Sequence, residues 1–156
     1  MRKLKVLIGG AESVFCGVRK AALELTGCEV IHAPDGKQAC AAVLAANVDL
    51  CIFDWDLPKM NGLAACCWIR SVELTAQPHI VLLTEKMHPE QIEAAYRAGA
   101  NDFIAKPLTL EDLRSLVLRF AHKVSQQEMA CRHLTHLDPL ELYRRDLNTV
   151  KAFPRL

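Results

Sequence analysis

Short apolar runs alternate along this chain with longer segments whose apolar residues recur every three or four positions. The runs have the length of β-strands, and the longer segments have the period of amphipathic helices. Such an alternation is typical of βα units, in which crossover helices connect parallel strands. Five units are predicted, with strands at 5–8, 30–33, 50–53, 79–83 and 102–105 and helices at 13–26, 35–46, 62–72, 89–98 and from 109 onwards.

Residues that commonly begin or end helices support these bounds. Gly27 and Gly99 follow the first and fourth helices, where glycine accepts a left-handed backbone. Pro89 suits a first helical turn, and Thr109 with Asp112 three residues later is a relative of the capping box. The core-facing residues predicted for the first and last helices are Val14, Val18, Ala22 and Leu25, and Leu110, Leu113, Leu116, Val117, Phe120 and Val124.

Composition limits the class of protein. The chain has 156 residues, 51% of them hydrophobic and 24% charged, which suits one domain with one core. A net charge of +1 lacks the basic excess of nucleic-acid-binding surfaces, and no apolar run has secretory or membrane-spanning length. The seven cysteines, an odd number that includes adjacent Cys66 and Cys67, suggest reduced thiols. We expect a cytoplasmic protein that binds neither nucleic acid nor membrane.

The character of the chain changes after about residue 122. The last 34 residues hold 6 basic and 4 acidic side chains and are too few for an effector domain. We therefore predict a domain at 1–122 and a C-terminal helical extension at 123–156. An apolar seam continues from Val117 to Leu134 at heptad-like spacing, so a dimerising helix and an ordinary terminal helix are both open.

Three side chains of chemical interest follow predicted strands, namely Asp54, Thr84 and Lys106. Ligand sites of open parallel α/β sheets form at the carboxyl ends of the strands. There, a carboxylate nucleophile, a hydroxyl and an ammonium group are suited to handling a phosphoryl group. A plain Asp54–Lys106 ion pair beside an ordinary Thr84 explains the same pattern.

Three segments resemble the receiver domain of two-component response regulators, a likeness that extends over residues 3–122. They are 54–62, Asp-Trp-Asp-Leu-Pro-Lys-Met-Asn-Gly; 82–84, Leu-Leu-Thr; and 99–107, which contains Gly-Ala-Asn-Asp-Phe and ends in Lys-Pro. The resemblance implies a flavodoxin-like (βα)5 fold, a doubly wound five-stranded parallel sheet, here followed by the helical extension. It also implies a cis Lys106–Pro107 bond.

The resemblance also implies a role for each site residue. Asp54 is the phosphoacceptor position, modified by a histidine kinase or a phosphotransfer protein. Lys106 holds the phosphoryl group, Thr84 follows it, and Phe103 is a rotameric switch or, equally, a core residue. This is phosphoacceptor chemistry at most, so we do not expect an enzyme.

The chain departs from the family after its first strand. Receivers have two adjacent acidic residues there to bind Mg²⁺, whereas this chain has Gly10 and Ala11, with Glu12 one position later. Because Mg²⁺ needs oxygen ligands, Asp54 and Glu12 are weak candidates, and we expect no metal unless the chain is a working phosphoacceptor.

Three further residues are expected to modulate the pocket. Glu85 stands where the family commonly has a small residue, so its carboxylate narrows the mouth and repels a phosphate. Asp56 and Lys86 flank the same entrance and are placed to form an exposed ion pair across it.

Two main functions follow from these residues. One is an atypical receiver, or pseudo-receiver, with impaired Mg²⁺-dependent phosphorylation, which binds signalling proteins: a histidine kinase, a phosphotransfer protein, a downstream effector or a second copy. The other is a receiver phosphorylated at Asp54. By resemblance, partners bind the face made by the fourth helix, fifth strand and fifth helix, with Glu93, Arg97, Asp102 and Arg114 as candidates.

The cysteines, two histidines near the C-terminus and residues 137–147 show weaker patterns. Redox sensing through Cys51 and Cys16 is a third reading, although buried thiols are usually inert. Cys131, His133 and His136 lack a fourth ligand at metal-site spacing. Residues 137–147 resemble the opening of diguanylate cyclase (GGDEF) domains, but no catalytic segment follows.

Overall fold

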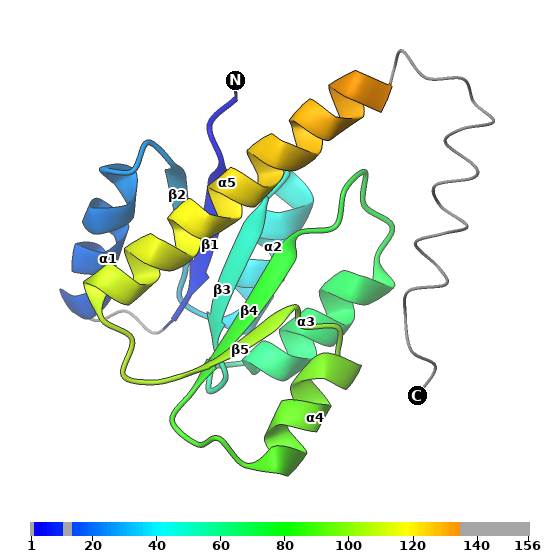
Figure 1. The fold of residues 1–156 in the computed structure, drawn as a ribbon. Coiled ribbons are helices and arrows are strands. Elements are labelled where there is room, and N and C mark those ends of the chain that lie inside the picture. Colours follow the sequence, from blue (N-terminus) through cyan, green and yellow to red (C-terminus); the bar gives the residue numbers. More distant parts are fainter. Residues whose placement is uncertain (1, 11–13, 135–156) are drawn as a thin grey trace. The chain divides into compact units, whose positions relative to one another are not determined.

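The computed structural model of the chain describes residues 2–10 and 14–134. Its elements, shown in Figure 1, are β1 (Lys5–Gly9), α1 (Val14–Glu24), β2 (Glu29–Ala33), α2 (Gly36–Ala46), β3 (Leu50–Asp54), α3 (Gly62–Ser71), β4 (His79–Thr84), α4 (Pro89–Arg97), β5 (Asp102–Ala105) and α5 (Leu110–Leu134). Contacts divide the chain into two units, Met1–Val117, which holds the sheet, and Leu118–Leu156. Each predicted strand is confirmed to within one residue.

The sheet is parallel throughout and has the strand order β2-β1-β3-β4-β5. The chain moves one way from β1 to β2 and the other way afterwards. Because parallel crossovers are right-handed, α1 covers one face, and α2, α3 and α4 cover the other (Figure 1). The predicted doubly wound, five-stranded fold is confirmed, with its switch point between β1 and β3.

The inner strands β1, β3 and β4 are almost wholly buried, as expected of strands covered on both faces. Leu113, Leu116 and Val117 of α5 join the core as predicted. Leu25 was wrongly assigned to it: α1 ends at Glu24, so Leu25 lies in the following turn and is 88% exposed, while Leu23 is buried. Leu110, the first residue of α5, is also exposed.

The other five predicted core residues have different outcomes. The side chains of Val14 and Val18 lie outside the described part of the chain. Ala22 is half-buried. Phe120 and Val124 belong to the second unit.

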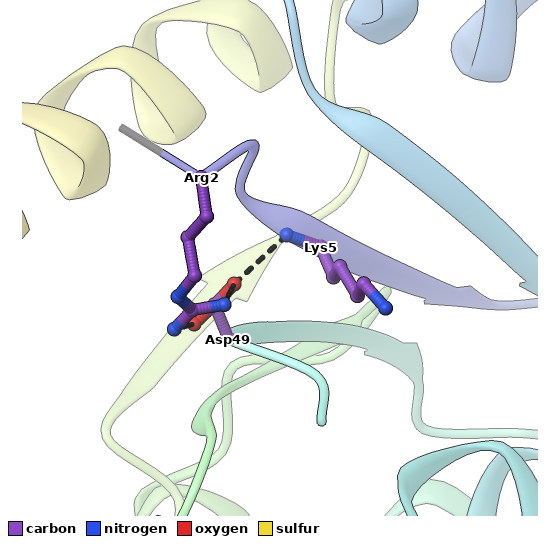
Figure 2. Close-up of polar contacts among 3 residues, drawn as sticks. All are labelled: Arg2, Lys5 and Asp49. Atoms are coloured by element: carbon purple, nitrogen blue, oxygen red, sulfur yellow. Dashed lines mark hydrogen bonds and ion pairs between the residues drawn. The ribbon is translucent and has the colours of Figure 1, made fainter. Parts of the chain in front are cut away.

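Asp49 joins the amino ends of three strands, and Figure 2 shows its contacts with Arg2 and Lys5. Its carboxylate accepts two hydrogen bonds from the Arg2 guanidinium, at 3.0 and 2.5 Å, and one from the backbone N–H of Lys5 at 2.9 Å. Its backbone N–H donates to Lys5 O at 2.9 Å, and its carbonyl accepts from His79 N–H at 2.9 Å. Asp49 therefore holds β1, β3 and β4 in register at the edge opposite Asp54.

Arg70, near the end of α3, ties this helix to the loops before β4 and β5. Its Nε donates to Gly99 O at 2.8 Å, Nη1 to Pro78 O at 2.8 Å, and Nη2 to Asn101 Oδ1 at 2.7 Å. Gly99 has a φ of 94°, and a Cβ there would lie 2.6 Å from Arg70 Cγ. Glycine at this position thus allows both the turn and the close approach of the arginine stem.

The cap predicted at Thr109 is present, and the structure shows a further cap at Asp35. Asp35 is the N-cap of α2, where its Oδ1 accepts from Gln38 N–H at 2.8 Å. Thr109 and Asp112 cap each other at the start of α5: Asp112 N–H donates to Thr109 Oγ1 at 3.1 Å, and Thr109 N–H donates to Asp112 Oδ2 at 3.0 Å. None of the described helices is both long and apolar enough to cross a lipid bilayer.

Gly36 provides a test of how tightly α2 packs against the loop that follows β3. A Cβ at Gly36 would lie 1.8 Å from the carbonyl oxygen of Met60, which is backbone and cannot swing aside. We expect Gly36→Ala to lower the free energy of unfolding in urea by about 1–3 kcal/mol or more. Gly17→Ala is the matched control, because nothing lies within 4 Å of a Cβ there; it should stabilise helix α1 by up to about 1 kcal/mol. Equal effects of the two variants would contradict this packing.

Candidate functional site

The sheet brings Asp54, Thr84 and Lys106 to the carboxyl edge, as predicted: Asp54 and Thr84 are the last residues of β3 and β4, and Lys106 directly follows β5. Asp54 and Lys106 form an ion pair in which Nζ lies 3.1 Å from Oδ1, and both side chains are about three-quarters buried. No described group makes a well-aligned hydrogen bond to this buried carboxylate oxygen. Among the described residues, the polar group close to Asp54 Oδ1 is thus the ammonium of Lys106.

Thr84 is buried, and its hydroxyl is engaged with its own loop. Oγ1 accepts a hydrogen bond from Lys86 N–H at 3.2 Å and lies 3.3 Å from Lys86 O, to which it donates. The carbonyl of Thr84 accepts from Lys106 N–H at 2.7 Å, so the two site residues are backbone neighbours. The Lys106–Pro107 peptide bond is cis, as the resemblance implies.

Gly10 follows β1 at the position of the first acidic residue of receivers. It is buried, its N–H donates to Ala33 O at 3.1 Å, and its carbonyl accepts a hydrogen bond from His32 Nε2 at 3.0 Å. Sequence reasoning missed His32, because only the pairing of β1 with β2 brings it beside Gly10. Ala11 and Glu12 lie outside the described residues.

Asp35 and Lys59 form a second ion pair near this edge. Lys59 has a φ of 64°, which is uncommon for a residue other than glycine, and its Nζ lies 3.4 Å from Asp35 Oδ2. The hydrogen bond from Gln38 N–H lowers the pKa of the buried Asp35, burial opposes that shift, and Lys59 adds to it. The pair therefore holds the loop after β3 against the start of α2. The spacing of the two residues gives no sign of this contact.

Two aromatic rings meet beside the site. Phe103 on β5 and Trp55, directly after Asp54, are both half-buried and pack against the core. Their centroids are 6.0 Å apart and their planes cross at 83°, an edge-to-face arrangement. Sequence reasoning selected Phe103 but not Trp55, although an aromatic residue next to a phosphoacceptor position was a visible signal.

The remaining predicted residues, Asp56, Glu85 and Lys86, are exposed. The expected Asp56–Lys86 ion pair is not among those formed by the described residues. The backbone of Lys86 is bound to the Thr84 hydroxyl.

No described group of three or more His, Cys, Asp or Glu side chains is placed to hold a metal ion. The side chains of Cys131 and His133, together with all of His136 and residues 137–147, lie outside the described part. Burial raises the pKa of the Cys66 thiol to about 11 and raises that of Cys51 further. Such thiols are protonated and poorly reactive, which argues against redox sensing by Cys51; the Cys16 side chain lies outside the described part.

Comparisons with known proteins agree with this fold. The family model of the response regulator receiver domain matches residues 6–118. The chain is 31% identical to the transcriptional regulatory protein RprY of Bacteroides fragilis over 111 residues, which cover 71% of this chain and 46% of that protein. It is 27% identical to the chemotaxis protein CheY of Pseudomonas aeruginosa over 94 residues, 60% of this chain and 76% of that protein.

Solved structures show the same fold. The chemotaxis response regulator CheY4 of Vibrio cholerae is 27% identical, with a TM-score of 0.68 over 76% of this chain and 99% of that one. The receiver domain of the Francisella response regulator 1452 is 23% identical and has a TM-score of 0.69 over 78% of this chain and 99% of that one, a likeness of fold alone.

The chain therefore belongs to the response regulator receiver domain family of two-component systems. It spans about half the length of the first curated relatives that it matches.

The lowered pKa of Asp35 predicts a pH dependence. Because the folded pKa lies below 3.8, the carboxylate contributes stability that is complete above the unfolded value and is lost as pH falls through the folded pKa. We expect the free energy of unfolding of the native chain to fall more steeply on acidification below about pH 4 than that of Asp35→Asn. Urea unfolding from neutral to acid pH measures this, with Asp56→Asn, at an exposed carboxylate, as control. Parallel curves for the native chain and Asp35→Asn would contradict it.

Proposed function

We propose that this chain is an atypical receiver module that signals by binding other proteins and whose Mg²⁺-dependent phosphorylation at Asp54 is impaired. The observation that carries the proposal is Gly10, which has no side chain where receivers place the first acidic residue of the metal site. Its neighbour Ala11 offers no side-chain oxygen either.

The described residues do not fit a magnesium site. Mg²⁺ requires near-octahedral oxygen ligands, usually from one or two carboxylates together with waters. Asp54 supplies one carboxylate, and the Lys106 ammonium 3.1 Å from its Oδ1 competes with any cation for that charge. A catalytic metal ion contributes several kcal/mol, and each ~1.4 kcal/mol changes a rate tenfold. Phosphoryl transfer is therefore expected to be slower by orders of magnitude.

The Lys106 ammonium and the Thr84 hydroxyl both have partners without a phosphoryl group. Lys106 pairs with Asp54, and the Thr84 hydroxyl bonds to the backbone of Lys86. A phosphoryl group at Asp54 would have to break the first contact and draw Thr84 from the second. Both costs add to the effect of the missing metal ligands. They support a receiver module whose Asp54 site stays in one conformation.

Partners are proposed to bind α4, β5 and the start of α5. Glu93, Arg97, Asp102 and Arg114 are all exposed. Glu93 and Arg97 pair with each other 2.5 Å apart, and Asp102 lies 3.1 Å from His79. The half-exposed Tyr96 adds apolar area, and aromatic residues and arginine are enriched in interfaces. The proposed receiver comprises residues 1–122, with 123–156 as an extension.

The second candidate is a working phosphoacceptor. Asp54, Thr84 and Lys106 meet at one edge of the sheet, and the chain belongs to a family of signalling domains. Glu12 would have to complete the metal site. The name of one relative, the DNA-binding dual master transcriptional regulator RpaA of Synechocystis, also raises DNA binding as an output of a longer protein, but the net charge of +1 gives that no support.

A magnesium titration followed by beryllofluoride separates the two candidates. In ¹⁵N-labelled native protein, we expect the amide signals of Asp54, Thr84, Phe103 and Lys106 to stay in place at millimolar Mg²⁺. The double variant Gly10→Asp/Ala11→Asp should show saturable shifts that grow with beryllofluoride, because it restores two carboxylates. Ala11→Asp alone serves if Asp at the buried Gly10 prevents folding. Saturable shifts in the native chain would establish the working phosphoacceptor instead.

Charge reversal tests the binding face. Arg97→Glu and Arg114→Glu should each weaken binding to a histidine kinase or phosphotransfer domain of the same genome at least tenfold by titration calorimetry, a loss of about 1.4 kcal/mol. Lys37→Glu, an exposed charge on α2, is the control that should bind as the native chain does. Unchanged binding in both arginine variants would remove this face from the proposal.

A further inference from the structure

Trp55 has a backbone held at two points. It continues the parallel ladder past Asp54, where its N–H donates to Leu83 O at 2.8 Å, and its carbonyl accepts from Gly62 N–H at 2.9 Å. A Cβ at Gly62 would lie 2.5 Å from the carbonyl oxygen of Asp54, so the start of α3 is pressed against this turn. The Trp55 backbone, which carries the indole ring, therefore cannot shift unless Asp54 shifts with it.

Strand register determines which side chains share a face with Trp55. Phe53 pairs with Leu82, and Leu82 pairs with Phe103, so these three form one row across β3, β4 and β5. Trp55 is two residues after Phe53, and Thr84 is two residues after Leu82. Because side chains alternate along a strand, Trp55 and Thr84 point to the same face as this row.

The edge-to-face contact is therefore a diagonal contact across β4. The Trp55 and Phe103 centroids are 6.0 Å apart, although their strands are separated by β4. Both rings pack against the core cluster that contains Phe53 and Leu82. Thr84 is on β4, between the two strands, and its hydroxyl bonds to Lys86. The two rings thus form a second link from the Asp54 turn to β5, besides the ion pair of Asp54 with Lys106, the residue after β5.

We propose that Trp55 is a positioning residue that holds the Phe103 ring in one rotamer. This inference rests on the proposed function, in which β5 is part of the partner-binding face and the Thr84 hydroxyl stays bound to its loop. In this arrangement the position of the turn after Asp54 determines the rotamer of Phe103 through Trp55. The partner-binding face then depends on the indole ring and not on the Thr84 hydroxyl.

The proposal predicts different effects of two neighbouring substitutions. Trp55→Leu should release the Phe103 ring, and loss of an edge-to-face contact changes a rotamer ratio by about 2- to 10-fold. Thr84→Val removes the hydroxyl but keeps the shape, and it should leave the ring in one rotamer. Trp55→Phe retains an aromatic ring and should restore much of the single rotamer.

Three-bond couplings to Cγ of Phe103 measure its χ1 populations and are insensitive to the loss of a ring current. They are recorded on the full chain without metal or beryllofluoride, and Phe103→Leu assigns the signal. Trp68→Leu is the matched control, because Trp68 is also half-buried against the core but sits on α3. We expect averaged couplings in Trp55→Leu and native couplings in Trp68→Leu and Thr84→Val.

A single native rotamer in folded Trp55→Leu would overturn the proposal, as would averaging in Thr84→Val alone. If Trp55→Leu fails to fold, Phe103→Leu in a Trp68→Phe background reports the same contact from the other side, through the anisotropy of Trp55 fluorescence. That anisotropy should fall, and an unchanged value would overturn the proposal. Because no metal is added, a live magnesium pocket would refute the proposed function while leaving this result intact.

Discussion

The placement of β1 between β2 and β3 is the constraint on which the rest of this structure depends. Since β1 and β3 are neighbours in the sheet but not in the chain, the crossovers reverse direction there and leave the carboxyl ends of β1 and β3 side by side. Asp49 reinforces this pairing from the other end, where its carboxylate and backbone hold Arg2, Lys5 and His79. The position of Asp54 beside Gly10 follows from this register.

The carboxyl edge has receiver geometry without the usual distribution of charge. A receiver balances a lysine against three carboxylates and a metal ion, whereas Lys106 here faces Asp54 with Gly10 beside it. The neighbouring polar groups are occupied as well: Gly10 O accepts from His32, and the Thr84 hydroxyl bonds to Lys86. An ion pair that is largely buried loses hydration, so the close approach of its partners compensates that loss. We infer that the Asp54–Lys106 ion pair stays formed and is not readily replaced by contacts to a metal ion or a phosphoryl group.

The surroundings of this edge are rigid for separate reasons. On one side, the loop after β3 is held by the Asp35–Lys59 ion pair and by the contact between Gly36 and Met60. On the other side, the same turn reaches β5 through the Trp55 and Phe103 rings. At the opposite edge of the sheet, where the strands begin, Arg70 joins α3 to the loops before β4 and β5. None of these contacts belongs to the hydrogen-bond ladder of the strands.

The sequence by itself determined the local features of this protein. The alternation of apolar runs and amphipathic segments predicted every strand to within one residue, and the cap at Thr109 lies where short-range spacing placed it. These features depend on residues that are close together in the chain. The meeting of Asp54 with Lys106 was also predictable, since parallel strands share one edge. Only the tertiary structure decided that Leu25 is exposed, that His32 bonds to Gly10, and that Trp55 meets Phe103. Those outcomes depend on where a helix stops and on which rows of side chains the register aligns, and no spacing along the chain encodes either one.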